Sequence, residues 1–214
     1  VEWQGRSPIP ADRTQVVIRS PMADGSMSGD AVTGNLASND TFMLKGLLKG
    51  EHYFRVEGLP SPWSIKRIEL NGADITDIAV NFRFRQVENG LRVIFTDTSG
   101  EIFGWIRPGP GDVTAGYAVI AFSTNPTSWF PRSRQVAITR ATDATGGYRI
   151  RGLPPGEYYL ACTRDYDESD VGTPKALEML AQNGGLPRVQ LKEGERKLVD
   201  VRPTLRRAAP VSRQ

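Results

Sequence analysis

Short runs in which hydrophobic and polar residues alternate cover most of this chain, and this period-two pattern predicts β-strands. The pattern is clear at Glu157–Thr163, where Tyr158, Leu160 and Cys162 fall on one face of an extended segment. Clusters of Gly, Pro, Asn and Asp separate the runs, and Asn71-Gly72 is a dipeptide favoured in type I′ hairpin turns. The sequence therefore predicts an all-β protein built from many short strands.

One phrase of this pattern occurs twice. Residues 42–53 (FMLKGLLKGEHY) align without a gap with residues 148–159 (YRIRGLPPGEYY), at an offset of 106 residues. A period near one hundred residues is too long for a solenoid repeat, and it suits a β-sandwich of roughly 100 residues. We therefore predict two tandem antiparallel β-sandwiches, residues 1–97 and 98–203, followed by a basic tail at 204–214.

The offset also predicts an incomplete first module. Phe42–Leu44 and His52–Val56 are expected to form two of its strands. The opening strand of the second module, Glu101–Arg107, maps to positions −5 to 1, so the first module should lack most of its own first strand. Val1–Trp3 would be the remnant of that strand, or a strand from elsewhere would fill the gap. An unfilled edge exposes backbone N–H and C=O groups, which favours addition of a strand from a partner protein.

One segment of the second module departs from the β pattern. Thr173 is a favourable N-cap, and the apolar spacing that follows predicts a short helix at Pro174–Asn183. Two further strands, Arg188–Leu191 and Lys197–Val201, are expected to close the module as a hairpin.

Composition and charge exclude only a few classes of function. The net charge of +3 is modest, so no nucleic-acid partner is predicted, and the basic tail is interpreted as a frayed end. The longest apolar run, Tyr117–Phe122, is far too short to span a bilayer. Cys162 is alone, so no intrachain disulfide is expected. Because the sequence begins at Val1 instead of Met, we interpret it as processed or as a fragment, which leaves export open.

The second copy of the repeated phrase contains a more specific motif. Residues 152–159 (GLPPGEYY) resemble the carboxypeptidase regulatory-like domain family, which are transthyretin-like (Ig-like) β-sandwiches with a carbohydrate-binding-like fold. The resemblance covers residues 99–203 and, more loosely, residues 14–97, where Leu48 and Lys49 replace the usual prolines. It implies bacterial modules that occur in tandem in periplasmic, extracellular or cell-surface proteins. It implies no catalytic activity, because enzymes that carry the module perform their chemistry in a separate domain.

The sequence offers little catalytic chemistry. His52 is the only histidine, which excludes a multi-histidine metal centre, and it aligns with Tyr158 in the repeat. We expect the His52 ring to bond a nearby backbone group, as the tyrosine hydroxyl would. No Gly-x-Ser-x-Gly elbow is present, and Cys162 lies on a predicted core face, where a thiol is inert. We therefore predict no enzyme and no cofactor.

Aromatic residues outside the strand pattern are the candidates for binding. Trp129 and Phe130 lie in a Pro/Ser-rich loop, and Trp3 is a third candidate near the start of the chain. Exposed aromatic side chains commonly mark contacts with sugars or proteins, although these rings could also fold back over the end of the sandwich. Trp63 and Trp105 belong to strands and are expected in the core.

An acidic cluster is a weak calcium candidate. Asp165, Asp167 and Asp170 supply oxygen ligands at suitable spacing. The loop lacks the glycine and the final acid of an EF-hand, and acidic residues before a helix also stabilise its N-terminus without a metal.

Taken together, the sequence predicts a non-catalytic extracytoplasmic scaffold or accessory subunit. Its partners would be other protein subunits of an envelope-associated assembly, recruited by strand addition at the first module. The alternative is a carbohydrate-binding module that holds a polysaccharide on its loop aromatics, Trp129 and Phe130.

Overall fold

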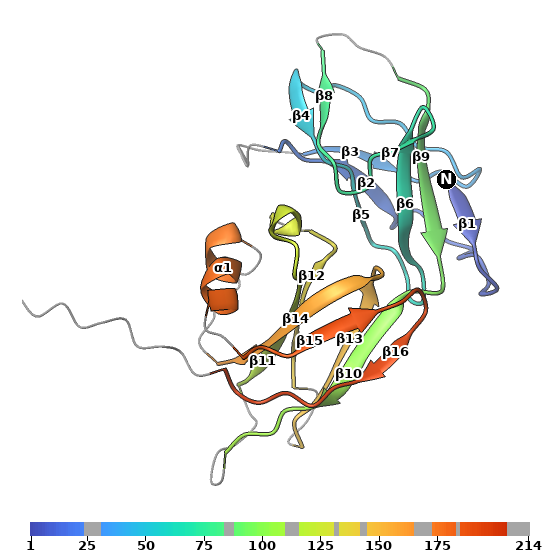
Figure 1. Cartoon of the computed structure of the whole chain (residues 1–214). Helices are drawn as coiled ribbons and strands as arrows, with labels where there is room; N and C mark the ends of the chain where they lie inside the picture. The colour runs from blue at the N-terminus through green and yellow to red at the C-terminus, as the bar shows by residue number, and fades with distance from the viewer. Residues whose placement is uncertain are drawn as a thin grey trace, which may run out of the picture. The chain divides into compact units, whose positions relative to one another are not determined.

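The protein is described by a computed structural model that covers residues 1–23, 31–83, 88–109, 116–130, 133–141, 145–164, 173–182 and 185–204. The chain divides into two compact units, Val1–Ser99 (unit 1) and Gly100–Gln214 (unit 2), shown in Figure 1. Each unit is built from β-sheets around its own hydrophobic core, and unit 2 carries one short α-helix. The predicted all-β fold class is confirmed.

The described residues of unit 1 form three small sheets. The first has the order β1 (Glu2–Gln4), β9 (Leu91–Thr96), β6 (Ser64–Leu70) and β7 (Ala73–Asp74). The second is β3 (Val32–Asn35), β2 (Val17–Ser20) and β5 (Arg55–Glu57), and the third is β4 (Gly50–His52) with β8 (Val80–Phe82). Their inward side chains form one core whose largest buried members are Ile18, Leu36, Phe54, Ile68 and Phe95.

The hairpin between β6 and β7 follows the sequence prediction. Asn71 and Gly72 both have positive φ angles, 51° and 85°, as a type I′ turn requires. Glycine adopts this conformation without the steric cost that a Cβ atom adds, and asparagine tolerates it better than most residues.

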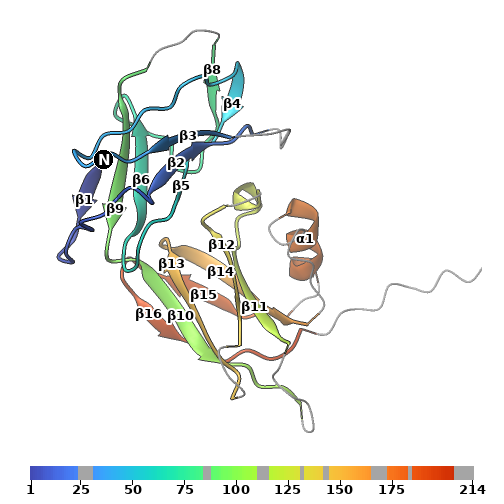
Figure 2. The same cartoon turned by 180° about the vertical axis from the view of Figure 1, so that it is seen from behind.

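Unit 2 is a two-sheet sandwich, seen from both sides in Figures 1 and 2. One sheet has the order β13 (Gly147–Leu153), β10 (Gly100–Trp105) and β16 (Arg196–Leu198). The other is β12 (Val136–Arg140), β11 (Ala118–Ser123), β14 (Gly156–Thr163) and β15 (Arg188–Leu191). A 3-10 turn, η1 (Pro126–Ser128), follows β11.

The predicted helix is also present, as α1 (Pro174–Gln182). The Thr173 hydroxyl accepts a hydrogen bond from the Ala176 N–H at 3.3 Å, which is the expected N-cap interaction. Leu177 on this helix is buried in a second cluster with Ile120 and Phe122 of β11. The helix therefore covers the face of the β11–β14 sheet that points away from the main core.

Two details of the predicted topology are wrong. β15 and β16 do not form a hairpin, because β15 pairs with β14 in one sheet and β16 pairs with β10 in the other. The pairing of β16 with β10 is parallel, as is that of β1 with β9, so the sandwiches are not wholly antiparallel. A strand pattern fixes which residues face inward, but it does not fix which neighbour completes the ladder.

Candidate interaction site

The two copies of the repeated phrase differ in their strand pairing. In unit 2, β13 pairs with β10 from Gly147 to Leu153. The counterpart in unit 1 is residues 41–47, and this segment belongs to no strand. Across the parts of the chain that the structure describes, the backbone of Phe42–Leu47 makes no hydrogen bond. The prediction of a paired strand at Phe42–Leu44 is therefore wrong, because no segment that the structure describes forms backbone hydrogen bonds with it.

The segment nevertheless keeps the side-chain alternation of a strand. Phe42 and Leu44 are half-buried against the core of unit 1, whereas Met43 is 65% exposed and Lys45 is also exposed. Gly34 of β3 lies directly beside the segment, because a Cβ atom on Gly34 would sit 2.5 Å from the Met43 carbonyl oxygen. Residues 41–48, which we call the open edge, thus lie in place for a strand partner.

The register of unit 2 identifies which backbone groups face that partner. The N–H of Ile106 donates to the Gly146 carbonyl at 2.8 Å, and the same register pairs Tyr148 with Gly104 of β10. Backbone groups that bond one neighbour alternate along an antiparallel strand. At the offset of 106, the groups turned towards the partner therefore belong to Phe42 and Leu44. The Met43 carbonyl, which points at β3, fits this alternation.

β1 closes one end of the open edge. The nitrogen of Val1 donates to the Asp40 carbonyl at 2.5 Å, and the Trp3 indole N–H donates to the Asp40 side chain at 3.0 Å. The Trp3 ring packs on Trp63 and Phe95, with ring centroids 4.9 and 4.6 Å away. Trp3, a predicted binding residue, is therefore half-buried and fixes β1 to the core.

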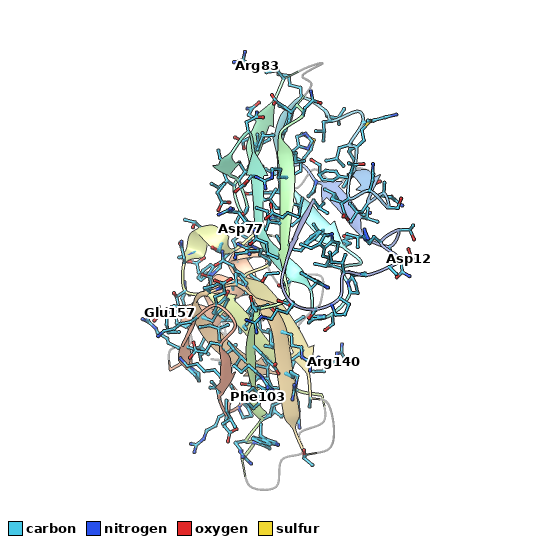
Figure 3. All side chains as sticks on the ribbon, turned by 90° about the vertical axis from the view of Figure 1, so that its right-hand side faces the viewer. Asp12, Asp77, Arg83, Phe103, Arg140 and Glu157 are labelled. Atoms are coloured by element: carbon cyan, nitrogen blue, oxygen red, sulfur yellow. The ribbon has the colours of Figure 1, made fainter. Side chains whose placement is uncertain are left out.

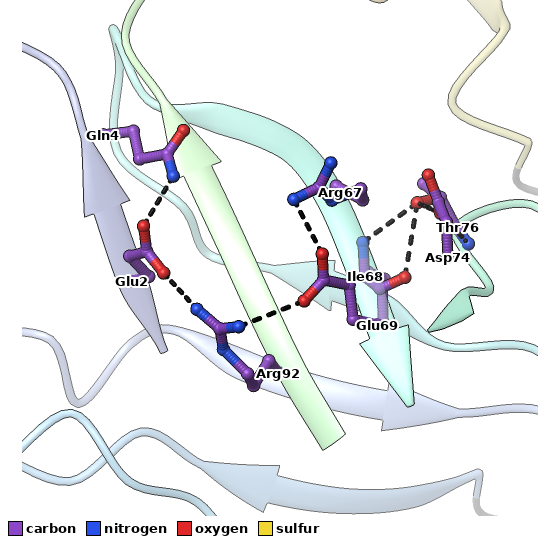
Figure 4. A network of polar contacts seen from close by, with 8 residues as sticks. All are labelled: Glu2, Gln4, Arg67, Ile68, Glu69, Asp74, Thr76 and Arg92. Atoms are coloured by element: carbon purple, nitrogen blue, oxygen red, sulfur yellow. Dashed lines mark hydrogen bonds and ion pairs between the residues drawn. The ribbon is translucent and has the colours of Figure 1, made fainter. Parts of the chain in front are cut away.

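A network of charged side chains holds the outward side of β1 (Figure 4). Arg92 of β9 pairs with Glu2 of β1 and, at 3.2 Å, with Glu69 of β6, which also pairs with Arg67 at 2.7 Å. Hydrogen bonds from Gln4 and then Arg92 lower the pKa of the Glu2 carboxyl. The network ties together three neighbouring strands, so the open edge begins beside a fixed element.

The structure places Trp129 and Phe130 at the end of the second sandwich. The Trp129 indole N–H donates to the Ser123 carbonyl at 2.7 Å, and its ring meets Phe122 edge-on at 5.8 Å. Both loop aromatics are half-buried, and Trp129 packs with the cluster under α1. These contacts explain Trp129 as a packing residue, and a binding role for the two rings stays a prediction.

His52 lies in a closed environment. Its Nε2 is 3.0 Å from the Leu48 carbonyl oxygen, and its Nδ1 is 3.2 Å from the Ser20 hydroxyl. Ser20 and His52 are each only 1% exposed, so a substrate does not reach this Ser–His pair. Because a carbonyl oxygen only accepts, Nε2 carries the proton and the ring serves as a structural link.

The remaining sequence candidates divide between core and surface. Burial raises the pKa of the Cys162 thiol to about 12, and the side chain is fully buried, which suits an inert thiol. Trp63 is buried as expected. The expectation for Trp105 is wrong, since it is 38% exposed. Side chains alternate along β10, and Ile102 points to the core. Trp105, three residues later, therefore falls on the opposite face.

The described residues show neither a metal site nor a membrane-spanning helix. The calcium candidates Asp165, Asp167 and Asp170 lie outside the described residues. Elsewhere, within the described ranges, no three His, Cys, Asp or Glu side chains gather closely enough to hold a metal ion. The same ranges contain no helix with the length and apolarity of a membrane span.

Comparisons with known proteins give distant likenesses only. No family model and no curated protein matches the sequence. Among solved structures, the chain is similar to the minor pilin GBS52 of Streptococcus agalactiae, with 13% identity, a TM-score of 0.32, and coverage of 93% of this chain and 87% of that one. It is also similar to BcpA, the major pilin subunit of Bacillus cereus, with 8% identity, a TM-score of 0.31, and coverage of 95% and 98%.

A third similar structure is the Bacillus anthracis TIE protein, with 12% identity and a TM-score of 0.29. The match covers 88% of this chain but only 29% of that protein. Scores this low assign the chain to no fold family and carry no argument about its function.

Proposed function

We propose that this chain is a non-catalytic, extracytoplasmic scaffold or accessory subunit that binds another protein subunit by accepting an extended strand at the open edge of unit 1. The observation that supports this proposal is that the backbone of Phe42–Leu47 forms no hydrogen bond with any residue that the structure describes, although it lies beside an intact core. Extracytoplasmic location and membership of the carboxypeptidase regulatory-like family are parts of the same proposal, supported by the GLPPGEYY motif of residues 152–159.

Strand addition would satisfy both the backbone and the side chains of this segment. Main-chain hydrogen bonds supply affinity in this mode of recognition, and alternate side chains supply specificity. The exposed Met43 and Leu48 offer apolar surface beside the new strand. Lys45 and Lys49 are exposed on the same edge, and lysines at edges discourage indiscriminate pairing between copies. The edge therefore suits a different protein better than a second copy of this chain.

A strand peptide tests the geometry. A synthetic peptide with the sequence of residues 100–107, the strand that fills this position in unit 2, is added to the full chain labelled with ¹⁵N. We expect slower hydrogen exchange at the Phe42 and Leu44 amides, by at least about ten-fold at saturation. The Met43 amide, which the alternation of backbone groups turns away from the added strand, is the internal control and should change little. A scrambled peptide that protects the same amides equally, or no protection by either peptide, would overturn the proposed docking geometry.

Crosslinking tests the biological partner. A photo-reactive residue replaces Met43, and a matched variant carries it at Met179, which is 52% exposed on α1. The proposal predicts one crosslinked protein in the envelope fraction that is specific to position 43 and is displaced by the strand peptide. Crosslinks that form only within one polypeptide would show that the edge is filled intramolecularly, and the scaffold role would be rejected.

The carbohydrate-binding alternative gains no support from the described geometry. Trp129 uses its indole N–H and one ring edge inside the protein. A sugar platform needs an aromatic face that is open to solvent.

A further inference from the structure

The outward face of the β13–β10–β16 sheet combines aromatic and charged side chains. Along β10, Gly100, Ile102 and Gly104 point inward, and the residues between them point outward. Neighbouring strands continue this face in register. We call it the arginine face, and its members are Glu101, Phe103, Trp105, Arg107, Arg149, Arg151, Arg196, Leu198 and Asp200. Phe103, in its middle strand, is labelled in Figure 3.

Aromatic rings hold the guanidinium groups in place. The Phe103 ring lies between Arg149 and Arg196, whose guanidinium carbons are 5.8 and 5.5 Å from its centroid. Arg107 lies 5.5 Å from the centroid of Trp105. Stacking on an aromatic ring is attractive and reduces the motion of the arginine side chain. Three of the four arginines are thus positioned before any ligand arrives.

The charges on this face do not balance. Glu101 lies 2.8 Å from Arg149, 3.1 Å from Arg196 and 4.0 Å from Arg151, so one carboxylate serves three guanidinium groups. The Glu101 side chain is only 12% exposed, whereas these arginines are 42–60% exposed. The second carboxylate pairs with the fourth arginine, Arg107. Four arginines against two acids leave a net charge of +2, carried on the solvent side.

We propose that the arginine face binds an extended acidic polypeptide segment whose carboxylates alternate along its chain. Arg149 and Arg151 are two residues apart on β13, so their side chains repeat about every 6.6–7 Å along the strand. Carboxylates on alternate residues of an extended peptide repeat at the same distance. The guanidinium fork matches a carboxylate in a bidentate manner. This site is on unit 2, and it does not depend on strand addition at unit 1.

The rings argue against a sugar ligand here. Phe103 is covered by a guanidinium group on each side, and Trp105 carries Arg107. A sugar would have to displace these groups in order to stack. The exposed donors are instead the guanidinium N–H groups, and Leu198, which is 57% exposed, adds an apolar contact beside them. Carboxylates and a small apolar side chain are the groups that this face can recognise.

Binding of defined peptides to the full chain tests the proposal. The probe is a ten-residue peptide of alternating Glu and Thr, and the comparison is a peptide of the same composition with its glutamates in one block. We expect the alternating peptide to bind at least about five-fold more tightly, and to weaken as salt rises because surface charges are screened. Equal binding of the two peptides would overturn the proposal, since charge alone would then suffice.

Two variants of the face and one matched control locate the site. Arg149→Gln combined with Arg151→Gln should weaken binding by about ten-fold or more. Arg188→Gln is the control, because Arg188 also stacks on an aromatic ring of unit 2, Tyr159 at 5.1 Å, but lies on the other sheet. Leu198→Glu changes no ion pair that the structure shows and should also weaken binding.

Two other anionic ligands are tested as alternatives to the acidic peptide. A polyuronate and vesicles that contain anionic lipid are titrated under the same conditions. If either binds and the alternating peptide does not, the acidic-polypeptide proposal is rejected in favour of that ligand. Equal loss with Arg188→Gln and with the double variant would reject the arginine face as the site.

Discussion

The Nε2 atom of His52 lies 3.0 Å from the carbonyl oxygen of Leu48, four residues earlier in the chain. At the same place in unit 2, the Tyr158 hydroxyl donates to the Pro154 carbonyl at 2.7 Å. The two copies of the repeat thus make the same ring-to-backbone bond with different side chains. Each bond fixes the turn between the two halves of the repeated phrase, and this confirms the structural role expected for His52.

Replacing His52 should therefore change stability through this bond. His52→Phe leaves the buried Ser20 hydroxyl and the Leu48 carbonyl without their ring partner, so we expect a loss of about 1–3 kcal/mol in the free energy of unfolding. His52→Gln keeps an N–H donor near the position of Nε2 and should lose less. Urea denaturation of both variants measures the difference. An equal loss in the two variants would show that ring packing, and not the hydrogen bond, is what matters.

Trp129 should behave as a packing residue of unit 2. Trp129→Phe removes the hydrogen bond to the Ser123 carbonyl and should cost about 0.5–1.5 kcal/mol. Trp129→Ala also removes contacts with Phe122, and we expect a loss of about 2–4 kcal/mol in the free energy of unfolding. Ile138→Ala, at a 39% exposed site on β12, is the control and should cost less. If Trp129→Ala caused no loss of stability, the packing role would be rejected and a binding role for Trp129 would be supported.

Cys162 should resist thiol reagents in the folded protein. Burial favours the neutral thiol and raises its pKa to about 12, so almost no thiolate forms near pH 8. We expect alkylation with iodoacetamide to be slow in buffer and fast in denaturant, as followed by mass spectrometry. The raised pKa also implies that stability falls as the pH rises above the unfolded value of about 8.5. Rapid labelling in buffer would contradict the buried environment.

Asp97 should give stability at neutral pH that is lost in acid. Its carboxylate accepts hydrogen bonds from the N–H groups of Ser7 and Arg6, at 2.7 and 2.8 Å, and these bonds lower its pKa. A lowered pKa in the folded state stabilises the protein above the unfolded value of about 3.9, and the effect disappears as the pH falls through the folded pKa.

The test for Asp97 compares the wild type with Asp97→Asn in urea at several pH values. The variant should be less stable at neutral pH, and the difference should shrink as the pH falls below about 4. A difference that stays constant with pH would mean that the carboxylate charge plays no part.

The candidate sites were only partly predictable from the sequence. The repeat offset predicted an incomplete first module, and among the described residues the backbone of Phe42–Leu47 forms no hydrogen bond. The arginine face was missed, although two signals were present: Glu101, Phe103 and Trp105 alternate along one strand, and Arg149 and Arg151 alternate along another. Trp105 was expected in the core because it belongs to a strand, but alternation along β10 places it on the face opposite to Ile102.

The sequence by itself determined the strand-rich class, the Asn71-Gly72 turn and the Thr173 cap, because each of these depends on residues close together in the chain. Only the tertiary structure decided that β16 lies parallel to β10, that no described segment forms backbone hydrogen bonds with Phe42–Leu47, and that four arginines share two carboxylates. These features join segments far apart in the chain, and alternation alone does not specify which strand pairs with which.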